Sequence, residues 1–142
     1  MISMTKEKLQ GKYVLYQLLN QNLESLKQQL ELVEQKFIEV KSTMLSIDDL
    51  KGMDGGNEIF LPLGSGCYGK GEVTDNKEIL VNVGAGIFVN KKTASAKSFL
   101  DERVKELEKA GGEIQSQMER IVKQLNELGV EIQELARQGE KP

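Results

Sequence analysis

The sequence predicts an α+β fold, mostly α, in which two long helices form an antiparallel coiled coil and two β-hairpins lie between them. Three observations predict it. Apolar residues recur at alternating spacings of three and four in both end segments, which is the heptad pattern of coiled coils. The middle segment loses this period and contains a glycine-rich repeat. The composition, with 5% aromatic and 29% charged residues, suits thin helical seams better than a thick globular core.

The first helix is expected over residues 5–51. Its apolar seam is interrupted only by Lys12, and glycine at position 52 is expected to end the helix because it accepts the left-handed conformation. The seam residues are Leu9, Tyr16, Leu19, Leu23, Leu26, Leu30, Val33, Phe37, Val40, Met44 and Ile47.

The second helix is expected over residues 93–138, with the hydroxyl of Thr93 capping a free amide of the first turn. Its seam residues are Leu100, Val104, Leu107, Ile114, Met118, Ile121, Leu125, Leu128, Ile132 and Leu135. Gly111 is the one gap in the series. Gly111, Gly112 and Gly129 each destabilise a helix interior by about 0.5 to 1 kcal/mol relative to alanine. Either they let the helix flex, or they allow close approach opposite a bulky residue.

The first seam runs over residues 9–47. The register of the second, extended back to Lys97, covers 97–135, so the two seams have equal lengths. Helices joined by a compact connector can pair along their whole length only if they are antiparallel, and at 1.5 Å per residue the pair would be roughly 60 Å long. Residues whose numbers sum to about 144 should then lie opposite each other. This register places Gly111 near Val33, Leu135 near Leu9, and both chain ends together at one tip.

The middle segment, residues 54–92, contains Glu58-Ile59-Phe60-Leu61-Pro62-Leu63-Gly64-Ser65-Gly66 and, twenty residues later, Glu78-Ile79-Leu80-Val81-Asn82-Val83-Gly84-Ala85-Gly86. Each copy is predicted to form strand, Gly-x-Gly turn and strand, with a turn at 75–77 between the copies. Pro62 should lie at an edge or a bulge. Isolated hairpins are marginal in water, so their edges should pair with other subunits in an intersubunit sheet or barrel. The expected interface residues are Ile59, Leu61, Leu63, Tyr68, Val73, Ile79, Val81, Val83, Ile87 and Val89.

This order of heptad helix, paired hairpins and heptad helix resembles a prefoldin subunit of the α class, archaeal or eukaryotic. The most specific motifs are Leu61-Pro62-Leu63-Gly64, the run 83–89 followed by Lys91-Lys92, and the run 94–100 that opens the second helix. The resemblance implies a single prefoldin-like domain over residues 1–142. It also implies a hexamer of two α-class and four β-class subunits whose hairpins form a double β-barrel. A cytoplasmic setting is expected separately, because the lone Cys67 cannot form an internal disulfide and no signal peptide or membrane span is predicted. In the family, arm tips hold non-native polypeptides without nucleotide and deliver them to a group II chaperonin.

If the tips bind such clients, they should present apolar residues that the seam does not use. The candidates are Ile2, Met4, Tyr13, Val14, Leu15, Leu18, Val130 and Ala136. The alternative is that some of them pack across a locally widened seam. Apolar residues outside the seam also occur at Leu32, Ile38, Leu45 and Val122, so the density of such residues singles out the tip.

The composition argues against other classes of function. The formal net charge of −3 without a basic cluster disfavours nucleic acid. No apolar stretch is long enough for a membrane span or a signal peptide. The run 64–69 matches G-x-G-x-x-G, but a strand rather than a helix is expected to follow it. With no histidine and only Cys67, no catalytic residue, metal site or cofactor is predicted, and Cys67 is expected to be a free thiol.

Two rival interpretations remain open. A prefoldin-like chain could self-assemble into homo-oligomers or filaments through the same hairpin edges, without a β-class partner. A generic coiled-coil scaffold would have no need of the β repeat.

Overall fold

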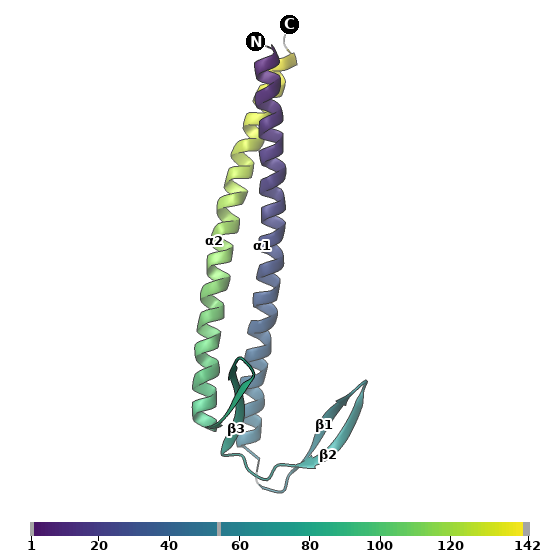
Figure 1. Cartoon of the computed structure of the whole chain (residues 1–142), viewed down its shortest axis with the longest axis vertical. Helices are drawn as coiled ribbons and strands as arrows, with labels where there is room; N and C mark the ends of the chain where they lie inside the picture. The colour runs from purple at the N-terminus through teal and green to yellow at the C-terminus, as the bar shows by residue number, and fades with distance from the viewer. Residues whose placement is uncertain (1, 54, 141–142) are drawn as a thin grey trace. The chain divides into compact units, whose positions relative to one another are not determined.

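The computed structural model describes residues 2–53 and 55–140, with side chains described for 4–53 and 55–139. Its elements are α1 (Ile2–Lys51), β1 (Glu58–Gly64), β2 (Cys67–Glu72), β3 (Glu78–Gly84), β4 (Ile87–Lys92) and α2 (Thr93–Glu140) (Figure 1). The predicted fold class of two long helices with two antiparallel hairpins between them is confirmed. Within the described residues the strands form two separate two-stranded sheets, so no closed barrel exists in the single chain.

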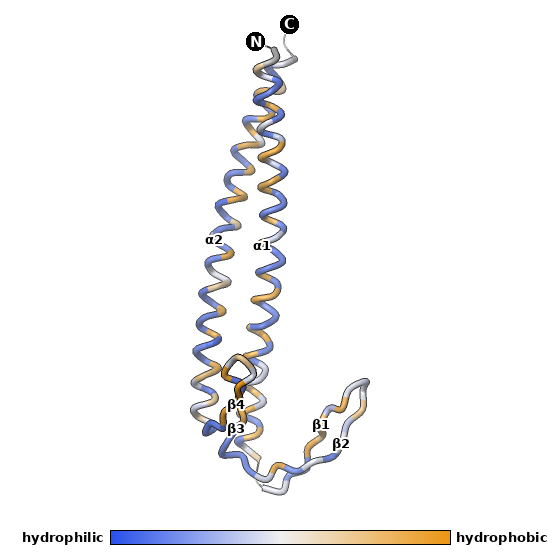
Figure 2. The backbone as a smooth tube through the Cα atoms, in the orientation of Figure 1, coloured by the Kyte–Doolittle hydropathy of each residue, from blue (hydrophilic) through white to orange (hydrophobic). Residues whose placement is uncertain are grey.

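The chain divides into two compact units, residues 1–35 with 107–142 and residues 36–106. In the first unit, α1 and α2 pack antiparallel. Leu26, Ile121 and Leu125 are buried at the centre. The partly buried residues packed against them are Tyr16, Leu19, Leu23, Ile114 and Met118. All of these belong to the predicted seams, which appear as repeating apolar positions on the helices in Figure 2.

The predicted register is confirmed in this unit. A Cβ atom placed on Gly111 would lie 3.7 Å from Cγ1 of Val33 and 3.9 Å from Cδ1 of Leu30. Lys12, the one charged residue in the first seam, is half-buried and forms an ion pair with Glu131 of α2. The seam interruption is therefore compensated by a carboxylate on the facing helix.

The second unit, residues 36–106, has its own buried residues. Val40 and Ile47 of α1 and Val104 of α2, all predicted seam residues, are buried together with Ala96. The ammonium group of Lys97 pairs with the carboxylate of Asp48, as the antiparallel register requires.

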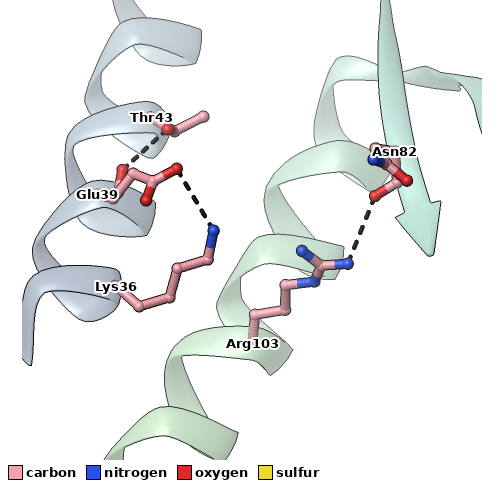
Figure 3. Close-up of polar contacts among 5 residues, drawn as sticks. All are labelled: Lys36, Glu39, Thr43, Asn82 and Arg103. Atoms are coloured by element: carbon pink, nitrogen blue, oxygen red, sulfur yellow. Dashed lines mark hydrogen bonds and ion pairs between the residues drawn. The ribbon is translucent and has the colours of Figure 1, made fainter. Parts of the chain in front are cut away.

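Local side-chain contacts accompany this packing in the second unit. Lys36 pairs with Glu39 at 3.4 Å, and the hydroxyl of Thr43 donates to the carbonyl of Glu39 at 2.9 Å (Figure 3). Each contact joins residues about one helical turn apart. The ion pair supports α1 locally, whereas the bond from Thr43 back to the i−4 carbonyl satisfies the hydroxyl without stabilising the helix.

The two hairpins have the same local geometry. Both central turn residues have positive φ in each copy, 50° and 78° at Ser65-Gly66 and 51° and 73° at Ala85-Gly86, as in the tight turns whose twist matches that of paired strands. The register shifts between Pro62 and Gly64 and again between Asn82 and Gly84. Pro62 therefore lies beside a bulge, as predicted from its missing amide donor.

Strand β2 is regular although it contains two glycines. The side chains of Leu61 and Leu63 in β1 lean over Gly71 and Gly69, and a Cβ on Gly71 would lie 3.1 Å from Cδ1 of Leu61. The glycines therefore give the β1 leucines room to lie flat against the neighbouring strand.

The second hairpin contacts α2. Arg103 donates from Nη2 to the carbonyl of Asn82 at 3.4 Å (Figure 3). Arg103 and Lys91 both lie against the ring of Phe99, 4.7 and 5.4 Å from its centroid. Such cation–π contacts are favourable, so they hold β4 and the start of α2 together.

Two details at the helix ends differ from the sequence predictions. Helix α1 ends at Lys51 as expected, but Gly52 does not have the positive φ of a left-handed cap. The side-chain amide of Asn76 instead donates to the carbonyls of Lys51 at 3.1 Å and Met53 at 2.7 Å. The hydroxyl of Thr93 donates to the carbonyl of Asn76 at 2.8 Å. Thr93 therefore ties the linker to α2, rather than capping a first-turn amide as we expected.

Candidate interaction surfaces

The apolar side chains predicted for the tip lie outside the seam. Met4, Tyr13, Val14, Leu15, Leu18 and Val130 are between 47% and 62% exposed. Ala136 is half-buried, and the side chain of Ile2 lies outside the described ones. Exposed aliphatic side chains at this density are typical of interaction surfaces.

Three residues of this group, together with Gly11, form a stripe on one face of α1. Gly11, Val14, Leu15 and Leu18 have the spacing i, i+3, i+4 and i+7, which places them on the same side of a helix. A Cβ on Gly11 would meet no atom within 4 Å, so the stripe is open at that position. The first turns of α1 thus have one apolar face in the seam and a second one that the seam does not cover.

A shallow groove follows one side of the helix pair in the first unit. Its middle section is lined by Leu15, Leu19, Gln124, Glu127, Leu128 and Glu131. The section nearer the chain ends is lined by Lys8, Lys12, Val130, Glu131, Glu134, Leu135 and Gln138. The section farther from the chain ends is lined by Asn22, Leu26, Gln117, Arg120, Ile121 and Gln124. Because Glu131 and Gln124 are each shared by adjoining sections, the three make one continuous groove, here called the tip groove.

The structure does not gather every predicted tip residue in one place. Leu15 and Val130 line different sections of the tip groove, whereas Val14 and Leu18 line neither. The apolar residues outside the seam elsewhere, Leu32, Ile38, Leu45 and Val122, are 43% to 67% exposed. Exposure alone therefore does not distinguish the tip, and only the spacing of its residues does.

The hairpins are the second exposed apolar surface. Leu61, Leu63, Tyr68, Ile87 and Val89, all predicted interface residues, are between 40% and 72% exposed. Ile59, Ile79, Val81 and Val83 are half-buried. Val73 is only 6% exposed, which corrects the expectation that it faces another subunit. Its amide donates to the carbonyl of Asn57 and its carbonyl accepts from the amide of Gly56, so Val73 continues the antiparallel pairing of the first hairpin just beyond the Glu58–Glu72 pair.

Three exposed hairpin residues were not predicted. Phe60, Leu80 and Phe88 are 57% to 68% exposed and alternate along their strands with predicted ones. The signal in the sequence is the continuous apolar run in each first strand, Ile59–Leu63 and Ile79–Val83, broken only by Asn82. Such runs are typical of strands covered on both faces, so both faces of each hairpin are candidates for contact.

The remaining motifs have structural explanations. The run 64–69 forms the end of β1, the turn and the start of β2, so no helix N-terminus faces its glycines. Cys67 is a free, exposed thiol. Among residues 2–53 and 55–140, no group of three or more Cys, Asp or Glu side chains is placed to hold a metal ion. In the same part of the chain, neither helix has a stretch apolar enough to cross a bilayer.

These features define a subunit in which two long helices are joined through two β-hairpins. The hairpins leave many of their apolar side chains exposed. The family model described as "Prefoldin subunit" matches residues 19–138, and the chain belongs to the prefoldin family, a family of chaperone subunits. The prefoldin subunit alpha of Methanobrevibacter smithii is 31% identical over 134 residues, which are 90% of this chain and 91% of that protein. The prefoldin subunit alpha of Pyrococcus horikoshii is 31% identical over 121 residues, 84% of this chain and 82% of that one.

A solved structure has the same fold. The filamentous PFD of Methanocaldococcus jannaschii, determined by cryo-EM, superposes with a TM-score of 0.72 over 86% of this chain and 98% of that one, at 16% identity. Because the sequences are so far apart, this likeness concerns the fold alone.

Proposed function

We propose that this chain is a subunit of an ATP-independent holdase that binds non-native polypeptides at coiled-coil tips and delivers them to a group II chaperonin. The observation that carries the proposal is the set of exposed apolar side chains at the tip, Met4, Tyr13, Val14, Leu15 and Leu18, which the seam leaves uncovered. Each contact with a client is weak, and several arms acting together supply the avidity. Release then needs no nucleotide, because a chaperonin can displace weak contacts one at a time.

Assembly in this proposal uses the hairpins. Two-stranded sheets with apolar residues on both faces are marginal in water, so residues 54–92 act as an oligomerisation platform. The proposed complex is a cytoplasmic hexamer of two copies of this chain and four β-class subunits, with an intersubunit β-barrel built from the hairpins. Membership of the prefoldin family supports assembly with other prefoldin subunits.

The proposal is tested by suppression of aggregation. A chemically denatured client protein is diluted into buffer with this chain, with a β-class subunit, or with the assembled mixture, and light scattering is followed. The mixture is expected to suppress scattering strongly without ATP. An assembled complex that leaves scattering unchanged would contradict the holdase role.

A second candidate function is a homo-oligomeric or filamentous scaffold. It is favoured by the fold shared with a filamentous PFD and by two hairpins per chain that can pair with copies of themselves. Native mass measurement separates the two candidates. A defined hexamer that forms only in the mixture favours the chaperone, whereas large homo-oligomers of the chain alone favour the scaffold.

A further inference from the structure

The charges around the tip groove are not symmetrical, and this asymmetry bears on what the groove can hold. In its middle section the apolar floor consists of Leu15, Leu19 and Leu128, and the only ionisable side chains are Glu127 and Glu131. Lysine and arginine occur only in the two outer sections, as Lys8 and Lys12 at one end and Arg120 at the other. In the middle section, carboxylates are therefore the only ionisable groups beside the apolar floor.

Glu127 and Glu131 share one side of α2 with Glu134, which lines the section nearer the chain ends. Glu127, Glu131 and Glu134 have spacings of four and three, which makes them neighbours on the helix surface, and like charges at such spacings repel each other. Only Glu131 has a cationic partner, Lys12. Among the described residues no ion pair involves Glu127 or Glu134. A cation brought into the groove by a ligand would thus meet a carboxylate, Glu127, that has no ion pair among the described residues, and it would add to the partial compensation that Lys12 gives at Glu131.

We propose that the tip groove prefers apolar polypeptide segments that carry lysine or arginine beside their apolar residues, with the cation paired to Glu127 and the apolar side chains on Leu15, Leu19 and Leu128. This inference rests on the proposed holdase function and names the class of client segment that it takes. Lys8 and Arg120 repel cations at the two ends, so the preference is for a cation at the middle of the segment. The contact is exposed, so each matched charge changes affinity by about two- to fivefold.

The test uses the assembled complex and short fluorescent peptides that share the same leucine and serine positions and carry lysine, glutamine or glutamate at the remaining ones. Fluorescence anisotropy is expected to give tightest binding for the lysine peptide and weakest for the glutamate peptide. The difference should shrink as salt rises from 0.1 to 1 M, because the screening length falls from about 10 to about 3 Å. E127Q should bring the lysine and glutamine peptides within about twofold of each other. The matched control E113Q removes an exposed carboxylate of α2 outside the groove and should leave the preference unchanged.

Each outcome has a separate meaning. Equal binding of all three peptides would overturn the charge preference and leave apolar capture standing. A preference that persists in E127Q would overturn the assignment to this groove. Binding of no peptide, together with no suppression of aggregation, would remove the holdase function and this inference with it. If E127Q changes the mass of the assembly, the groove is occupied by a second copy of the chain, and the proposal is wrong.

Discussion

The side-chain amide of Asn76 lies 2.7 Å from the carbonyl oxygen of Met53 and 3.1 Å from that of Lys51. The main-chain carbonyl of Asn76 accepts a hydrogen bond from the hydroxyl of Thr93. One linker residue thus connects the end of α1 with the start of α2. Carbonyls at a helix C-terminus have no partner within the helix, so this side chain satisfies groups that would otherwise depend on water.

Replacing Asn76 by alanine is expected to lower the free energy of unfolding by about 1 to 2 kcal/mol, because it removes one partly buried hydrogen bond, to Met53, and one exposed one, to Lys51. Urea denaturation followed by circular dichroism measures this loss. N90A, at an exposed β4 position, is the matched control and should cost less than about 0.5 kcal/mol. Equal effects of the two substitutions would contradict a connecting role for Asn76.

Alanine at the helical glycines is expected to stabilise the protein. A Cβ on Gly111 would sit at ordinary contact distance from Val33, and Gly112 and Gly129 face open space. Close helix approach therefore does not require glycine at any of the three. G111A and G112A should each raise the free energy of unfolding by about 0.5 to 1 kcal/mol, measured by urea denaturation. If the double variant is stiffer yet protects the same range of clients, arm flexing has no role in client choice.

The residues at turn positions 65 and 85 are not the ones best suited to the backbone conformation there. Ser65 and Ala85 have φ near 50°, a conformation that asparagine tolerates better than serine or alanine. S65N and A85N are therefore expected to stabilise their hairpins by up to about 1 kcal/mol, visible as a higher thermal midpoint. G86A, which places a Cβ at φ 73°, should lower the midpoint. A rise for G86A would contradict the turn assignment.

Polar substitution of the outer hairpin residues should prevent assembly. Phe60 and Leu80 are 68% and 61% exposed in the single chain, so F60S combined with L80S should change helix content little. In the proposed platform both positions face a neighbour, and native mass measurement with a β-class subunit should show loss of the hexamer. L45S, at an equally exposed position of α1 (66%), serves as the control and should assemble normally.

Polar substitution at the tip should impair client binding and leave assembly intact. Removing residues 1–8 and changing Tyr13, Val14 and Leu15 to serine is expected to leave assembly intact, because these side chains lie outside the seam, but to abolish suppression of aggregation. The matched variant L32S with I38S removes apolar residues of similar exposure from the middle of α1 and should keep activity. Full suppression by the tip variant would refute capture at this surface.

The sequence predicted the helices and hairpins well, because their determinants are local and periodic. The burial of Leu26, Val40 and Val104 follows directly from their heptad positions. The helix ends were harder to predict, since the partner of the α1 carbonyls is Asn76, twenty-five residues further along the chain. Val73 illustrates the same difficulty, because an apolar residue at the end of a strand can face a neighbour or its own chain. At the tip, the stripe of Gly11, Val14, Leu15 and Leu18 could be read from spacing. The groove could not, because its sections combine side chains of both helices and depend on how those side chains lie across the seam.

The repeated geometry of the two hairpins, with the same turn and the same bulge, has a consequence for the size of any assembly. A chain with two equivalent adhesive modules is bivalent, and bivalent units alone tend toward open-ended growth. Partners with a single such module would act as chain terminators. The ratio of the two kinds of subunit, rather than any single contact, would then decide between a closed particle and a polymer.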